Sequence, residues 1–282
     1  MASSTPKTFS LLTLTKPQPH IAHILLNRPT KLNAFSYNMW IEFGDAFREA
    51  SRDPDVRVVV LSAAGDRAFT AGLDVKDAAG DGVLSGSQED GARFAWKLRE
   101  RIELYQACVS AMEECVKPVI CAIHGLCLGL GIDIASCADI RIAASSSTFS
   151  VKEVEIGMAA DVGTLARLPK VVGNHSWVKD VCLTARDFSV SEAQSVGLVS
   201  RVVEGNREEV LKEAMDLAAV LAEKSPVAVQ GTKELLNYGT EHTVKEALRY
   251  TAVWNSAALQ GDDFRNALGA RMMKKKPTFA KL

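Results

Sequence analysis

The stretch from residue 149 to residue 168, FSVKEVEIGMAADVGTLARL, places three acidic side chains, Glu153, Glu155 and Asp161, among apolar and small residues. Asp161 has alanine and valine as its neighbours and a glycine two residues later. A carboxylate in such surroundings loses hydration, which raises its pKa toward the range useful for proton transfer. Each acid taken alone could equally be a solvated loop residue or a helix N-cap. Together they are candidates for general acid–base chemistry.

Two glycine-containing turns are candidates for holding a negative charge. They lie at residues 68–77 (AFTAGLDVKD) and 124–133 (HGLCLGLGID), each between a strand-like and a helix-like run. A turn of this kind leaves backbone N–H groups unpaired at the N-terminus of the helix. Two such turns facing one pocket would stabilise a developing oxyanion. The alternative interpretation is that the glycines only permit tight turns and close packing.

Several common site motifs are missing from the sequence. The five histidines are scattered and form no H-E-x-x-H, so no metal site is expected. Gly129 and Gly131 begin a dinucleotide fingerprint, but Ile134 stands at its third glycine. There is also no P-loop and no G-x-S-x-G hydrolase motif.

Composition narrows the class of protein. The chain has 282 residues, of which 47% are hydrophobic and 24% charged, and its formal net charge is -1. This balance lacks the basic excess of a nucleic-acid binder, so no nucleic-acid partner is expected. Six cysteines without a C-x-x-C pair predict buried free thiols in a reducing compartment. The N-terminal segment resembles neither a secretory signal nor an arginine-rich presequence. The longest apolar run contains His124 and Asp133, which predicts buried core and no membrane span.

The elements that must position these residues alternate along the first two thirds of the chain. Apolar runs predict strands at residues 21–27, 56–63, 118–125, 139–145 and 148–154, and helical spacing predicts a helix at 38–51. This alternation predicts α/β architecture with parallel pairing. Residues 78–91 are expected to form an exposed loop. Ser189 and Glu192 predict a capping box, with Gly197 as the stop. We expect an α/β core at residues 1–205 and a helical region at 206–282.

The turns, their spacing and the acids resemble the crotonase, or enoyl-CoA hydratase/isomerase, superfamily. The resemblance begins at LNRPTKLNAF (residues 26–35) and continues through the C-terminal helices. The run from GIDIASCADIR to FSVKEVEIGMAADVGTLARLPKVVGN is similar to the dienoyl-CoA isomerases of that superfamily, and SPVAVQGTK and TAVWN agree with it. The resemblance implies a crotonase-like spiral of ββα units with a C-terminal helical subdomain. It also implies a homo-oligomer, either a trimer or a dimer of trimers.

Position by position, the resemblance assigns roles to particular residues. It places the oxyanion-binding backbone N–H groups on Leu73 and Leu130, and the catalytic acids on Asp133, Glu153 and Asp161. Residues 31–34 would lie near the nucleotide end of coenzyme A. The superfamily usually has glycine where Leu130 stands, but the required group is a backbone N–H, which leucine retains. The substrate-binding residues would be Gly72, Leu73, Asp74, Val75, Lys76 and Gly131.

The implied reaction converts a 3,5-dienoyl-CoA to a 2,4-dienoyl-CoA in the β-oxidation of unsaturated fatty acids. Glu153 would remove a proton at C2, Asp161 would deliver one at C6, and Asp133 would support them. Coenzyme A is part of the substrate, so no separate cofactor is expected. Three alternatives stay open: an enoyl-CoA hydratase, a Δ3-Δ2-enoyl-CoA isomerase, and a noncatalytic crotonase-fold protein that binds RNA or scaffolds a complex. The resembled hydratases carry glutamate and glycine where Asp133 and Asp161 stand.

The C-terminal tripeptide is a candidate targeting signal. Ala280, Lys281 and Leu282 form a close variant of the S-K-L peroxisomal address. The preceding RMMKKKPTF is basic and contains Pro277, so we expect an extended and accessible tail. This predicts a protein of the peroxisomal matrix, with the import receptor as a partner.

Overall fold

The computed structural model describes residues 8–80 and 90–282, and its strands form two sheets. In the larger sheet, order β1-β2-β3-β5-β7-β10, only β1 and β2 pair antiparallel. In the smaller sheet, order β4-β6-β8-β9, only β8 and β9 pair antiparallel. The bounds are β1 Leu12–Gln18, β2 Ile21–Leu26, β3 Val58–Ala63, β4 Ala68–Thr70, β5 Val119–Ile123, β6 Leu126–Leu128, β7 Ile140–Ala144, β8 Thr148–Ser150, β9 Phe188–Ser189 and β10 Arg201–Val203.

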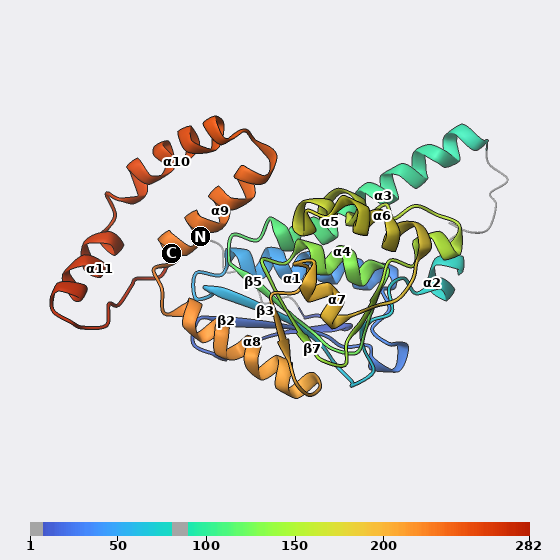
Figure 1. Cartoon of the computed structure of the whole chain (residues 1–282), viewed down its shortest axis with the longest axis horizontal. Helices are drawn as coiled ribbons and strands as arrows, with labels where there is room; N and C mark the ends of the chain where they lie inside the picture. Colours follow the sequence, from blue (N-terminus) through green and yellow to red (C-terminus); the bar gives the residue numbers. More distant parts are fainter. Residues whose placement is uncertain (1–7, 81–89) are drawn as a thin grey trace.

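Helices lie on both faces of the larger sheet (Figure 1). Their bounds are α1 Tyr37–Arg52, α2 Val75–Gly80, α3 Gly91–Glu113, α4 Leu130–Cys137, α5 Thr164–Val172, α6 His175–Thr184, α7 Val190–Ser195, α8 Arg207–Ala222, α9 Pro226–Glu241, α10 Val244–Ala258 and α11 Asp262–Met272, with 3-10 turns η1 Pro29–Lys31 and η2 Glu153–Ile156.

The chain advances as a spiral of repeated ββα turns. In three successive turns the first strand (β3, β5, β7) joins the larger sheet and the second (β4, β6, β8) joins the smaller. The central strands β3 and β5 are fully buried, as parallel strands covered on both faces must be. Each buried Val or Ile there contributes about 1.5–3 kcal/mol through burial of apolar surface. The predicted α/β spiral with a helical C-terminal part is confirmed.

Two apolar clusters lie on the two faces of the larger sheet. Helices α1, α3 and α4 contribute to the cluster on one face. Helix α8 covers the other face of the sheet (Figure 1). There it packs through Val210, Ala214 and Ala218 against alternate residues of β3, such as Val58 and Val60. The α8 residues recur every four positions, so they share one helix face. Helix α8 therefore belongs to the layer that covers the sheet.

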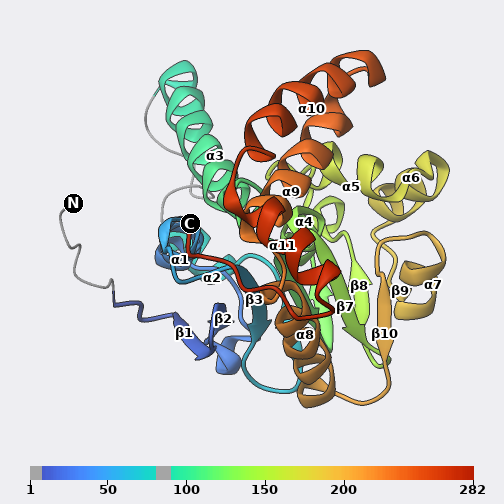
Figure 2. The same ribbon diagram turned by 90° about the vertical axis from the view of Figure 1, so that its left-hand side faces the viewer.

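Helices α9 to α11 extend away from the sheets (Figure 1), and in Figure 2, which is viewed from that side, α9 and α11 lie in front of them. Their exposed apolar side chains include Val244 and Met272, which are 77% and 79% exposed. The division at residues 205 and 206 stays a prediction. Within residues 8–80 and 90–282, every helix is too short or too polar to cross a membrane.

Some predicted elements differ from the structure. The strand predicted at 148–154 ends at Ser150, because the backbone of Lys152 turns to the αR region and η2 begins at Glu153. Ser189 does cap α7 by accepting from the N–H of Glu192 at 3.2 Å, and the chain turns at Gly197 with φ +85°. The Glu192 carboxylate does not return to the cap and binds Trp177 and Arg186 instead.

The exposed loop predicted at residues 78–91 is wrong at both of its ends, which are helical. Its first three residues complete α2, and Gly91 begins α3. Residues 81–89 lie outside the described residues. The 23-residue helix α3 then begins at Gly91 and was not among the predicted elements.

The cysteines and the C-terminal tail complete the fold. All six cysteines are buried and unpaired, as predicted. The backbone of the tail is tied to the body: the Arg57 guanidinium donates to the carbonyl of Phe279 at 2.7 Å and to that of Ala280 at 3.2 Å. Lys281 forms an ion pair with Asp55. The tail is therefore tied to the body through its backbone and through the Lys281 side chain, although Ala280, Lys281 and Leu282 remain exposed.

Candidate active site

The two glycine turns lie directly against each other. Strand β4 pairs with β6, which aligns Thr70 with Cys127 and brings the ends of both strands together. Gly72 and Gly129 then take φ values of +93° and +52°, which L-residues with side chains rarely adopt. A Cβ on Gly72 would lie 3.1 Å from the carbonyl oxygen of Leu128 and 3.5 Å from the backbone nitrogen of Leu130. Only glycine allows this approach.

The backbone N–H groups predicted to bind an oxyanion, those of Leu73 and Leu130, are unpaired. The backbone of Phe35 pairs with the first turn: its N–H donates to the Gly72 carbonyl at 2.8 Å, and its carbonyl accepts from the N–H of Asp74 at 3.0 Å. These two bonds lie on either side of Leu73 and do not use its N–H. Leu130 is the first residue of α4, where no carbonyl of the helix is available. In the described part of the chain neither N–H has a hydrogen-bond acceptor. Both can therefore donate to a ligand.

A buried asparagine holds the first turn in place. The Asn33 side chain is fully buried and donates to the carbonyls of Ala64 and Ala68, each at 2.9 Å. The Thr70 hydroxyl donates to the Asn33 carbonyl at 2.8 Å and accepts from the N–H of Gly72 at 3.1 Å. Sequence reasoning placed residues 31–34 near the nucleotide and missed this role. The available signal was an asparagine, which tolerates its φ of +54° better than most residues.

The three predicted acids come together beside these turns. Asp133, in the first turn of α4, is 2% exposed and accepts from the N–H of Thr164 at 2.6 Å. Glu153 begins η2, and its Oε1 would be 3.4 Å from a Cβ on Gly129. Its Oε2 is buried without a hydrogen-bond partner in the described structure. Asp161 lies half-buried in the segment before α5.

Electrostatics couples the three acids. Burial, together with the charges of Asp133 and Asp161, raises the pKa of Glu153 to about 7. Burial likewise raises the pKa of Asp133 to about 6 against the bond from Thr164. Burial also raises the pKa of Asp161. Near neutral pH the cluster can therefore both hold and release a proton.

Glu155, the remaining acid of the stretch, points elsewhere. It is exposed and pairs with Lys152 at 3.2 Å. The sequence alone did not separate its role from that of Glu153, because both lie in the same short turn.

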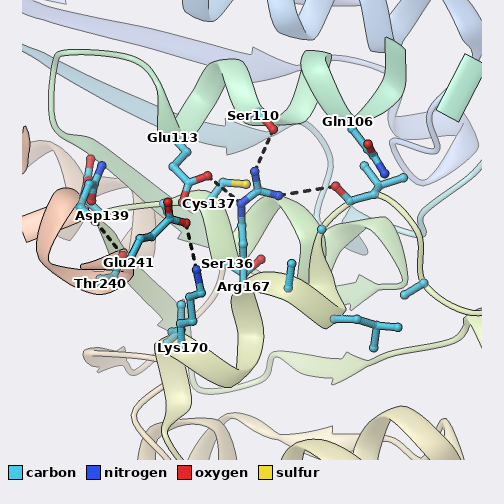
Figure 3. Close-up of a pocket in the computed structure, with 18 of the residues that line it drawn as sticks. Gln106, Ser110, Glu113, Ser136, Cys137, Asp139, Arg167, Lys170, Thr240 and Glu241 are labelled. Carbon is cyan, nitrogen blue, oxygen red and sulfur yellow. Dashed lines mark hydrogen bonds and ion pairs between the residues drawn. The ribbon is translucent and has the colours of Figure 1, made fainter. Parts of the chain in front are cut away.

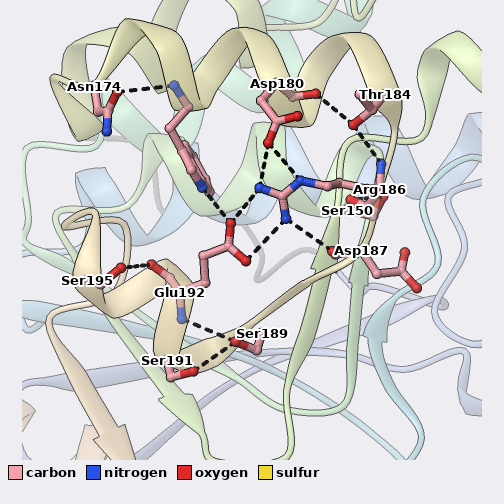
Figure 4. Close-up of polar contacts among 11 residues, drawn as sticks. Ser150, Asn174, Asp180, Thr184, Arg186, Asp187, Ser189, Ser191, Glu192 and Ser195 are labelled. Carbon is pink, nitrogen blue, oxygen red and sulfur yellow. Dashed lines mark hydrogen bonds and ion pairs between the residues drawn. The ribbon is translucent and has the colours of Figure 1, made fainter.

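The position of Glu153 depends on the chain that follows α6. The Ser150 hydroxyl, at the end of β8, donates to the carbonyl of Ala185 at 2.8 Å and to that of Arg186 at 3.2 Å. The Arg186 guanidinium ties α6 to α7 by bonding Asp180 and Glu192 (Figure 4). These bonds fix the end of β8, three residues before Glu153.

The remaining predicted binding residues lie around the first turn. Asp74 pairs with Arg28 at 3.0 Å, whereas Val75 and Lys76 are exposed at the start of α2. Gly131 is buried, and a Cβ there would meet the Cys127 sulfur at 3.0 Å and Thr70 Cγ2 at 3.1 Å. Glycine at 131 therefore allows α4 to pack closely behind the site.

A cavity of about 610 Å³ opens beside the acid cluster, between α3, α5 and α9. Figure 3 shows Arg167 at its centre, bonded to Ser110 and Glu113 of α3. Asp161 lines this cavity, but Asp133 and Glu153 do not. Leu73 and Leu130 do not line it either. Across residues 8–80 and 90–282, no cluster of His, Cys, Asp or Glu could hold a metal ion.

Comparison with known proteins agrees with this geometry. The profile of the family described as enoyl-CoA hydratase/isomerase matches residues 16–281. The mitochondrial Delta(3,5)-Delta(2,4)-dienoyl-CoA isomerase of Homo sapiens is 46% identical over 278 residues, covering 98% of this chain and 84% of that protein. The peroxisomal protein of the same name from Arabidopsis thaliana is 44% identical over 262 residues, covering 93% of each.

Solved structures give the same result. The putative enoyl-CoA hydratase of Streptomyces coelicolor A3(2) superposes with a TM-score of 0.88 at 29% identity, covering 99% of this chain and 98% of that one. The enoyl-CoA hydratase of Bacillus anthracis gives a TM-score of 0.86 at 26% identity, covering 96% and 99%. The predicted resemblance is confirmed, and the chain belongs to the enoyl-CoA hydratase/isomerase family.

Proposed function

We propose that this protein is a Δ3,5-Δ2,4-dienoyl-CoA isomerase. The observation that carries the proposal is the joint presence of two free backbone N–H groups and a second acid, Asp161, beside Glu153. The names of the human and Arabidopsis relatives support the same substrate and reaction.

The proposed reaction begins with the thioester oxygen between the N–H groups of Leu73 and Leu130. Glu153 removes a proton from C2, and the charge spreads from the carbonyl oxygen to C6 as a dienolate. The two N–H groups stabilise that charge, and losing one such donor typically costs roughly 3–4 kcal/mol of barrier. Asp161 then delivers a proton to C6. The product is conjugated with the carbonyl and is therefore more stable.

Opposite protonation states are required at the start: Glu153 ionised and Asp161 neutral. Glu153 holds its proton more firmly than an ordinary glutamate, because it is buried beside two other acids that raise its pKa. Asp161 is half-exposed, so an acyl chain lying over it would remove more water and raise its pKa further. Substrate binding would thus favour a proton on Asp161, and its charge would no longer raise the pKa of Glu153.

The alternatives fit the site less well. A hydratase needs two carboxylates around one water, whereas this site adds Asp161. A relative described as a probable enoyl-CoA hydratase from Mycobacterium bovis is 34% identical, below the values for the dienoyl-CoA isomerases of human and Arabidopsis. A Δ3-Δ2-enoyl-CoA isomerase needs one principal acid. A noncatalytic binding protein has no need for three coupled carboxylates.

A direct assay tests the function. Purified protein is incubated with a 3,5-dienoyl-CoA, and the absorbance of the conjugated 2,4-dienoyl thioester is followed. We expect the chromophore to appear at a rate proportional to enzyme concentration. Hydration of a 2-enoyl-CoA without any diene isomerisation would contradict the proposal and favour the hydratase.

We further propose that the enzyme is an oligomer, a trimer or a dimer of trimers, of the peroxisomal matrix. The exposed apolar side chains of α9 to α11 support the first part. The terminal Ala280-Lys281-Leu282 and the peroxisomal Arabidopsis relative support the second. The human relative is described as mitochondrial, so the proposed peroxisomal location depends mainly on the C-terminal tripeptide.

A further inference from the structure

A polar stripe on α3 contacts the segment that carries Asp161. Gln106, Ser110 and Glu113 are spaced four and three residues apart, which places them on one face of the helix. The Gln106 amide nitrogen donates to the backbone carbonyl of Asp161 at 2.6 Å. Gln106 and Asp161 both line the cavity, and Figure 3 shows Gln106 on α3 at its edge.

The other two residues of this stripe, Ser110 and Glu113, bind Arg167, which in turn contacts the residue after Asp161. Arg167 of α5 donates to Ser110 at 2.8 Å and to Glu113 at 2.7 Å. It also reaches the carbonyl of Val162 at 3.5 Å. A Cβ on Gly163 would lie 2.1 Å from Arg167 Nη1, so a side chain there would displace the guanidinium from this position.

The Asp161 segment has little other support. Residues 158–161 belong to no helix or strand, and no side chain of another described residue bonds the Asp161 carboxyl. Aspartate has a short side chain, so its backbone largely decides where its carboxyl lies. The opposite face of α3 is fixed in the core by Cys108, Val109 and Met112. Gln106 thus links this irregular segment to a rigid helix.

We propose that Gln106 is a positioning residue for the proton transfer by Asp161: its bond to the Asp161 carbonyl sets the reach of the carboxyl toward the distal carbon of the dienolate. This inference rests on the proposed isomerase function. It assigns Gln106 no role in the first proton transfer, because Glu153 is held separately through β8 and the chain after α6.

The two half-reactions allow a sharp test. Gln106→Met removes the donor with little change in volume, and Gln106→Glu keeps the shape but replaces the amide by a carboxylate. Gln194→Met, at an exposed glutamine of α7, is the matched control. Each variant is given a 3,5-dienoyl-CoA in deuterated water. Isomerisation and deuterium incorporation at C2 of the recovered substrate are measured together.

We expect kcat for isomerisation to fall by up to about a hundredfold in both Gln106 variants, the scale of loss from a misplacement of about 1 Å. KM and the rate of C2 exchange should remain at wild-type values, as should all three quantities in the control. A parallel fall in exchange and isomerisation would indicate general damage and overturn the inference, and so would unchanged isomerisation. A wild-type protein without isomerase activity would instead overturn the proposed function, and the inference with it.

Discussion

The backbone N–H of Thr164 donates to Oδ1 of Asp133 at 2.6 Å, across 31 residues of sequence. The bond joins the first turn of α4, where Leu130 offers its N–H, to the first residue of α5, just after Asp161. The bond holds one oxygen of the Asp133 carboxyl against the backbone at the start of α5. This supports the predicted role of Asp133 as a supporting acid, which stays a prediction.

Replacing Asp161 should separate chemistry from binding. Asp161→Asn removes the proposed proton donor at C6 and retains the side-chain shape. We expect isomerisation to fall by roughly 10²- to 10⁴-fold, the usual contribution of a general acid. Thermal unfolding and binding of a nonreactive acyl-CoA should be unchanged. Near-normal turnover by a correctly folded variant would remove Asp161 from the mechanism.

The pH dependence should report Glu153. As a base Glu153 must be ionised, and its pKa is about 7, so kcat/KM should fall as the pH drops through neutrality. Asp133→Asn removes a negative charge that raises this pKa, while an amide oxygen can still accept from Thr164. The acid limb should therefore move to lower pH in that variant. The measurement is kcat/KM against pH; a shift to higher pH would contradict the assigned coupling.

Substitution of Glu153 should reduce activity more than substitution of Asp133. Glu153→Gln should stop exchange of the C2 proton with deuterated water, whereas Asp133→Asn should only slow turnover. Exchange is measured on recovered substrate by mass spectrometry. If Asp133→Asn proved the more damaging change, the two roles would have to be exchanged.

The turn that presents the Leu73 N–H should not tolerate a side chain at Gly72. Gly72→Ala places a Cβ 3.1 Å from the Leu128 carbonyl at a φ of +93°, so the neighbouring Leu73 N–H must move. We expect kcat to fall by roughly 10²- to 10³-fold, as for loss of an oxyanion donor. Gly239→Ala in α9, where the added Cβ would have no described atom within 4 Å apart from its own helix backbone and chain neighbours, is the control and should keep full activity. Equal activity of both variants would argue against this site.

The exposed apolar residues of the C-terminal helices should be covered by other subunits. We expect a trimer or a dimer of trimers in sedimentation at micromolar concentration, and Leu248→Glu should weaken it by placing a charge in the contact. Lys179→Glu, at an exposed position of α6, is the control. A wild-type monomer would contradict the prediction. The relevant side chains are Leu236, Val244, Leu248, Val253, Leu259, Phe264, Leu268 and Met272.

Location of the sites along the chain was largely predictable from sequence. Continuous β-branched runs gave β3 and β5, because parallel strands buried on both faces need apolar residues at every position. The glycines at 72 and 129 marked turns that need unusual backbone angles. The small and apolar neighbours of Asp161 indicated a desolvated acid, and its pKa is raised by burial. These signals are local, so a single sequence carries them.

The tertiary structure alone decided which residues meet. Glu153 and Glu155 are two positions apart in one acidic turn, yet one enters the cluster while the other pairs with Lys152. Gln106 showed no sign of function, because its partner Asp161 is 55 residues away. The sequence by itself determined the chemical groups, the turns that present them and the family. Only the folded spiral fixed their distances and supports, because hydrogen bonds between distant segments depend on the path of the chain and leave no periodic pattern along it.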